Sequence, residues 1–70
     1  MSLPTKPAAV LRRGDVIGYE GRWRRVRALT RQTDALEGDV VVVAWEEGGF
    51  DRFPTEAEFL LGPVGHGQVP

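Results

Sequence analysis

The sequence contains no cysteine and only one histidine, and these shortages exclude several classes of small protein. Without cysteine, the 70-residue chain cannot use the disulfides or the cysteine-ligated zinc that stabilise many domains of this size. No apolar run approaches the roughly 18 residues that a membrane-spanning helix requires. The first seven residues, with prolines at positions 4 and 7, lack the apolar core of a secretory signal. We therefore expect one small globular domain in the cytoplasm, with no membrane contact.

Side chains that carry catalysis are also scarce. Nucleophilic catalysis needs a nucleophile, an adjacent base and a third group that holds the base. The only serine is Ser2, and the only histidine, His66, lies between two glycines. The adjacent acids Glu46 and Glu47 precede a Gly-Gly turn in water, and no set of residues has the ligand spacing of a zinc or calcium site. The sequence predicts no catalytic residue, no enzyme activity, no metal, no cofactor and no small-molecule substrate.

The chain does contain a series of short β-prone segments separated by glycine. The clearest is Val40–Trp45, in which four consecutive valines precede alanine and tryptophan. Near the end, Thr55-Glu56-Ala57-Glu58 matches the capping-box pattern and predicts a single helical turn. Strands are expected over residues 16–19, 22–29, 40–45, 50–53 and 59–61.

Short strands joined by tight turns are typical of a small closed barrel, because closure removes the exposed strand edges. The sequence therefore predicts an all-β fold, a small five-stranded barrel with one short helical turn before the last strand. The barrel is expected over residues 10–61. The prolines of residues 1–9 favour an extended N-terminal arm, and the glycines and prolines of residues 62–70 predict a flexible C-terminal tail.

The expected second strand, residues 22–29, carries too many arginines to alternate regularly. Either register places two arginines beside apolar residues in the core, and an unpaired buried guanidinium is costly. One extra residue, a β-bulge at Arg24-Arg25, resolves the conflict because Trp23, Val26 and Ala28 can then all point inward. The bulge predicts a group of arginines that project outward together: Arg22, Arg24, Arg25 and Arg27.

Three stretches of the chain resemble the SH3-like small barrels. They are Leu11–Ile17, Gly21–Val26 and Val41–Gly49, which follow the order x-x-G-D-x-I, G-x-W-x-x-V and V-x-V-x-W-x-x-G. This order is similar to that of short uncharacterised bacterial proteins of the same fold, and the resemblance covers about residues 11–61. It implies a binding or adaptor module without catalysis. The chain lacks the paired tyrosines of the peptide-binding SH3 domains, so proline-rich ligands are not implied.

A net charge of −1 conceals an uneven distribution of charge. Residues 1–31 contain eight basic and two acidic residues, a charge of +6, whereas residues 32–70 contain one basic and eight acidic residues, a charge of −7. Local potential rather than net charge steers association, so this asymmetry bears on partners. Alternatively, the two halves neutralise each other across adjacent strands.

The first hypothesis for a partner is another protein or a second copy of the chain. The Val40–Trp45 strand is apolar on both faces, so Val40 and Val42 point away from the core and form a contact surface. Alternatively, Pro4–Val10 folds over these valines. The residues expected to bind this partner are Arg22, Arg24, Arg25, Arg27, Val40 and Val42.

The alternative hypothesis is a nucleic acid, because the planar guanidinium can grip a phosphate with two donors. Two features oppose it: the many acidic residues, and the scarcity of aromatics for base stacking once Trp23 is assigned to the core. The residues expected to bind nucleic acid are Arg12, Arg13, Arg22, Arg24, Arg25, Arg27 and Arg31.

Overall fold

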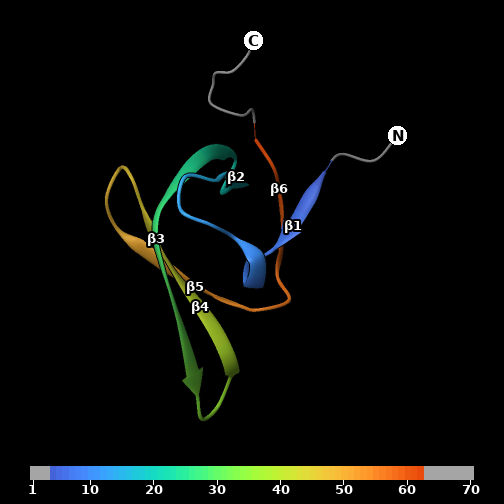
Figure 1. Cartoon of the computed structure of the whole chain (residues 1–70), viewed down its shortest axis with the longest axis vertical. Helices are drawn as coiled ribbons and strands as arrows, with labels where there is room; N and C mark the ends of the chain where they lie inside the picture. Colours follow the sequence, from blue (N-terminus) through green and yellow to red (C-terminus); the bar gives the residue numbers. More distant parts are fainter. Residues whose placement is uncertain (1–3, 63–70) are drawn as a thin grey trace.

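The computed structural model describes residues 4–62, which are built almost entirely of β-strands (Figure 1). The elements are β1 (Thr5–Pro7), the 3-10 helix η1 (Ala8–Val10), β2 (Val16–Tyr19), β3 (Arg22–Asp34), β4 (Gly38–Trp45), β5 (Phe50–Pro54) and β6 (Glu58–Leu60). One antiparallel sheet has the order β2-β3-β4-β5, and β1 and β6 form a second antiparallel sheet. The all-β prediction is therefore confirmed. No helix in this part of the chain is long and apolar enough to cross a membrane.

The predicted closed, five-stranded barrel is wrong, because the two sheets of the described residues do not close. β6 pairs with β1 and is linked to the larger sheet by a bridge between Leu61 and Ile17. β5 pairs with β4 alone among the described strands. Figure 1 shows the result: the β3–β4 hairpin extends away from the region where β1, β2 and β6 lie.

The folded part of the chain includes residues expected in the N-terminal arm. Thr5–Pro7 form β1, and Ala8, which is 1% exposed, belongs to the core. The N–H of Ala8 donates to the carbonyl of Ala57 at 2.7 Å, which attaches η1 to the turn before β6. Residues 1–3 of the expected arm and residues 63–70 of the expected tail lie outside the described residues.

The predicted helical turn before the last strand is also wrong. The N–H of Ala57 donates to the carbonyl of Pro54 at 3.0 Å and closes a β-turn there. The capping box does not form because both of its ends have other partners. The Thr55 hydroxyl bonds the carboxylate of the next residue, and the Thr5 hydroxyl donates to the Glu58 carboxylate at 2.8 Å. Glu58 already belongs to β6, so strand pairing begins where a helix would have to continue.

The core lies between the two sheets and is rich in β-branched and aromatic side chains. The predicted inward alternation of Val41, Val43 and Trp45 is confirmed, because all three are at most 2% exposed. Tyr19 and Phe53 pack edge to face beside them, with their ring centroids 5.0 Å apart. The buried residues of this core are Ala8, Leu11, Ile17, Val26, Val41, Val43, Trp45, Phe53 and Phe59.

β3 contains a β-bulge, but not where the sequence predicts it. The β2–β3 pairing is regular through Arg24 and Arg25. The register of β3 against β4 shifts between Val26 and Ala28, which makes Arg27 the extra residue. The predicted bulge at Arg24-Arg25 is therefore wrong.

The position of the bulge decides which side chains of β3 face the core. Val26 is fully buried, as predicted, but Trp23 is 52% exposed. Beyond the bulge, Leu29 packs against the core while Ala28 is exposed, the reverse of the expected direction. The regular pairing before the bulge directs Arg24 to the core side, where the acidic groups described below compensate its charge.

Candidate functional site

The four arginines predicted to project outward together divide between different partners. Arg22 and Arg24 reach the turn between β4 and β5, where both bond the carboxylate of Glu47. Arg25 and Arg27 instead donate to backbone carbonyl groups. The structure therefore does not bring these arginines together as one surface.

Arg24 lies in an acidic and aromatic cluster that explains its burial. Its side chain is 11% exposed, and its guanidinium carbon lies 4.5 Å from the centroid of the Trp45 ring. Its Nη2 and Nε atoms lie 2.8 and 3.0 Å from Oε2 of Glu47. Carboxylate oxygens of Glu20 and Asp51 lie 3.3 and 3.9 Å from its Nη1 atom. Three carboxylates and an aromatic ring thus stabilise a charge that would be costly if it were unpaired.

These contacts also shift the ionisation of the neighbouring groups. Burial opposes ionisation of Glu47, but hydrogen bonds and charges from Arg22 and Arg24 outweigh it and hold the pKa of Glu47 below its ordinary value. Burial raises the pKa of the Tyr19 hydroxyl, and the charge of Asp51 raises it further. The shift at Glu47 favours the charged carboxylate that the ion pairs with Arg22 and Arg24 require.

A second ionic contact lies at the end of the β3–β4 hairpin. One carboxylate oxygen of Asp34 accepts hydrogen bonds from the N–H groups of Leu36 and Glu37, at 2.7 and 3.0 Å. The other oxygen accepts a hydrogen bond from Arg52 at 3.1 Å. The two backbone bonds, followed by Arg52, hold the pKa of Asp34 below its ordinary value in spite of burial.

Acid is expected to destabilise the fold partly through Asp34. Because its pKa is lower in the folded chain, its ionised form contributes stability above the unfolded pKa of about 4, and this contribution is lost as the pH falls through the folded value. The thermal midpoint of Asp34→Asn, measured by circular dichroism, should therefore fall less than that of the wild type between about pH 6 and pH 2.

The matched control for this measurement is Glu37→Gln. Glu37 lies in the same turn, is exposed, and has no side-chain partner among the described contacts. This variant should follow the pH dependence of the wild type. The same pH dependence in Asp34→Asn and the wild type would contradict the assignment to Asp34.

Five other arginines have no carboxylate partner among the contacts of residues 4–62. The two oppositely charged halves pair where Arg22 and Arg24 bond Glu47, whereas the pairs Lys6–Asp15 and Arg52–Asp34 each lie within one half. The expectation that the halves neutralise each other thus holds for only some of the basic residues. The remaining group, called the arginine cluster below, contains Arg12, Arg13, Arg25, Arg27 and Arg31.

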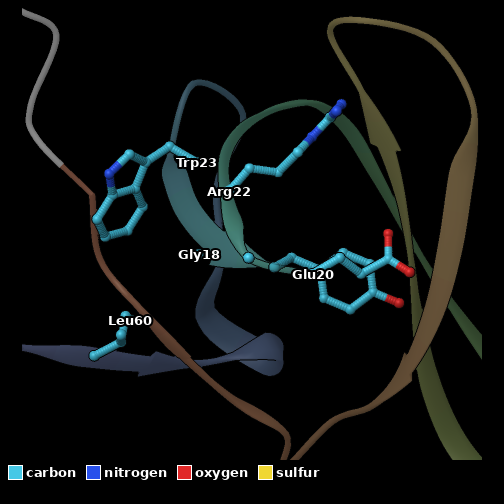
Figure 2. A pocket seen from close by; sticks show the side chains of 7 residues that line it. Gly18, Glu20, Arg22, Trp23 and Leu60 are labelled. Atoms are coloured by element: carbon cyan, nitrogen blue, oxygen red, sulfur yellow. The ribbon is translucent and has the colours of Figure 1, made fainter.

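Trp23 lies beside a shallow pocket at the β2–β3 hairpin (Figure 2). A Cβ atom at Gly18 would lie 3.3 Å from its ring, and one at Gly62 would lie 2.8 Å from it, so the two glycines provide room for the ring. Figure 2 shows Trp23 and Arg22 pointing in opposite directions, with Leu60 near the tryptophan side of the pocket. The prediction that Trp23 fills the core is therefore wrong. The exposure of Trp23 was not predicted, because Trp23 faces outward only if Arg24 lies on the core side of the strand.

The outer face of the larger sheet carries a shallow groove of about 440 Å³. Phe50, which is 68% exposed, lies opposite Ala44 in the ladder, and Arg52 lies opposite Val42. Val42 is half-buried in this groove, whereas Val40, which was expected to point outward with it, is 2% exposed. The residues of the groove, called the sheet face below, are Gln32, Val42, Ala44, Phe50 and Arg52.

The described residues therefore carry two surface features, the groove of the sheet face and the arginine cluster. Within residues 4–62, no three acidic or histidine side chains gather as a metal site would require. Ser2 and His66, which were considered for catalysis, lie outside the described residues. A scan against protein-family models, a search of curated proteins and a search of solved structures each found no match to this chain.

Proposed function

We propose that the chain is a non-catalytic interaction module that binds protein through the sheet face. The observation that carries this proposal is Phe50, a large aromatic side chain that is 68% exposed beside the groove. An exposed aromatic residue next to an apolar groove favours a contact site, because binding removes both from water.

A second copy of the chain is the occupant that the sheet face fits best. The protruding ring of Phe50 and the groove lined by Val42 and Ala44 belong to the same face. A two-fold axis through this face places the ring of each copy against the groove of the other, which is a self-complementary contact. Gln32 and Arg52 then form a polar rim around the apolar centre.

Replacing Phe50 by aspartate is expected to weaken self-association at least about tenfold, because the contact would bury an unpaired carboxylate. Sedimentation equilibrium of the wild-type chain should show an average mass that rises with concentration from one chain toward two. Phe50→Asp should remain close to one chain under the same conditions, with unchanged circular dichroism.

Leu36→Asp is the matched control, because it makes the same kind of change at a side chain that is 96% exposed at the β3–β4 turn and does not line the groove. It should associate like the wild type. A wild-type chain that stays monomeric at every attainable concentration would overturn the proposal, as would equal effects of the two substitutions.

The resemblance to the SH3-like small barrels belongs to the same proposal, in the form of an open relative of that fold. The order of the sequence motifs supports it, and so do the antiparallel order β2-β3-β4-β5 and the return of the chain beside β2 at Leu61. The role that the resemblance implies, a binding or adaptor module, agrees with the proposed function.

A further inference from the structure

The arginine cluster lies beside the loop that connects η1 with β2. Arg25 donates to the carbonyl of Gly14 at 3.2 Å, at one end of this loop, and Arg31 donates to a carbonyl of η1 at the other end. The loop itself carries two exposed arginines, Arg12 and Arg13. Apart from Arg27, which donates to the Trp45 carbonyl of β4, the cluster therefore combines arginines that are far apart in the sequence along the edge of β3 to which this loop is bonded.

The charge of this cluster is not compensated by the described contacts. The guanidinium groups of Arg25, Arg27 and Arg31 donate to backbone carbonyl groups, which carry no net charge. By contrast, Arg22, Arg24 and Arg52 are bonded to carboxylates. The acid across the ladder from Arg25 is Glu46, whose N–H donates to the Arg25 carbonyl at 2.9 Å and whose carboxylate forms no ion pair among the described contacts. A positive edge thus remains on a chain whose net charge is −1.

Trp23 adds an aromatic surface to this edge. Side chains two residues apart in a regular strand face the same side, about 7 Å apart, so Trp23 and Arg25 share a face of β3. The indole is 52% exposed, and Gly18 and Gly62 provide room for it. An exposed aromatic ring beside arginines supplies the two contacts that single-stranded nucleic acids use, base stacking and binding of the phosphates. This placement removes one of the objections to nucleic acid, the lack of an available aromatic residue.

We propose that this edge of β3 binds single-stranded nucleic acid, with phosphates on the arginine cluster and a base stacked on Trp23. A duplex presents its phosphates to the same arginines but keeps its base faces stacked inside the helix, so it gains nothing from Trp23. The proposed site shares no residue with the sheet face and does not depend on self-association.

The experiment measures the binding of the full chain to a labelled single-stranded oligonucleotide of mixed sequence by fluorescence anisotropy, with DNA and RNA in separate arms. The logarithm of the affinity should fall with the logarithm of the salt concentration, by about 0.7 for each phosphate contact. The double variant Arg13→Ala, Arg25→Ala should weaken binding about tenfold and reduce this slope by about 1.4.

The matched control is the double variant Arg22→Ala, Arg52→Ala. It removes the same amount of positive charge, but from arginines that are already bonded to carboxylates. Its affinity should stay within about twofold of the wild type. Glu46→Gln should strengthen binding about twofold, because it removes the negative charge opposite Arg25.

Trp23→Leu tests the stacking contact and should weaken single-strand binding about fivefold or more while leaving duplex binding unchanged. Binding of either DNA or RNA with the expected salt dependence and the expected effects of these substitutions supports the proposal. No binding at low salt would overturn it, as would equal losses in the two arginine double variants or no dependence on Trp23. Tighter binding to anionic lipid vesicles than to the oligonucleotide would overturn it as well. Phe50→Asp should keep the wild-type affinity, which separates this site from the proposed self-association.

Discussion

Replacing Trp45 by alanine is expected to lower the free energy of unfolding by about 3–5 kcal/mol. The side chain is fully buried, and its ring stacks on Tyr19 with the centroids 5.7 Å apart and meets Phe53 at a steep angle. The ring N–H donates to Asp51 at 2.8 Å, and the guanidinium of Arg24 lies over the ring face. Alanine loses all of these contacts and leaves a cavity, because the surrounding core relaxes only in part.

A loss of this size approaches the whole stability of the chain. Domains have about 0.05–0.15 kcal/mol of stability per residue, which amounts to about 4–10 kcal/mol for 70 residues. Urea unfolding followed by circular dichroism gives the difference directly. Trp23→Ala is the matched control, because it truncates the other tryptophan at a site that is 52% exposed. It should cost less than half as much, and equal losses would contradict the assignment of Trp45 to the core.

Replacing Arg24 by methionine is expected to lower the free energy of unfolding by about 2–3 kcal/mol. Methionine keeps much of the apolar stem, so the change removes mainly the guanidinium. Glu20, Glu47 and Asp51 would then lose a shared cation. Trp45 would lose the charge that lies 4.5 Å from its ring centroid.

The neighbouring residue provides the control for this substitution. Arg25→Met removes the same group from an exposed position and should change the free energy of unfolding by at most about 0.5 kcal/mol. A double-mutant cycle of Arg24→Met with Glu47→Gln should give a coupling of at least about 1 kcal/mol. Equal effects at Arg24 and Arg25, or a coupling near zero, would contradict the ion-pair network.

The strands were predictable because their signals are local. Four consecutive valines and a following tryptophan predict β4, and the alternation of Val41, Val43 and Trp45 gives its core side. The turn after β4 follows from its glycines, since Gly48 and Gly49 adopt φ angles of 110° and 82°. The structure confirms these features, and they account for the correct prediction of an all-β fold.

The directions of the β3 side chains were not predictable in the same way. A bulge at Arg24-Arg25 is expected only if an arginine beside the core stays unpaired. The partners that make Arg24 tolerable come from two different turns, Glu20 before β3 and Glu47 after β4. Their convergence depends on the tertiary fold, which no local pattern reveals.

The prediction of a closed barrel was wrong for a related reason. The sequence before Val10 has little hydrophobic periodicity, so it was expected to be an arm. Its strand, Thr5–Pro7, nevertheless takes the position beside β6, with Lys6 opposite Phe59. Short strands of this kind are stabilised by the partner they find rather than by their own composition. The candidate site was equally hard to predict from local sequence, because the exposure of Trp23 depends on the register of β2 against β3.

The pairing of β1 with β6 brings the two ends of the folded part together, with Leu61 donating to the carbonyl of Pro4 at 3.0 Å. The polypeptide thus enters and leaves the fold at adjacent points, about one interstrand spacing of 5 Å apart. Such a unit can be grafted into a surface loop of a larger host protein without separating the two stems of that loop. By the same geometry, a short linker between the ends and a cut at residues 35–37 give a circular permutant with every strand pair retained.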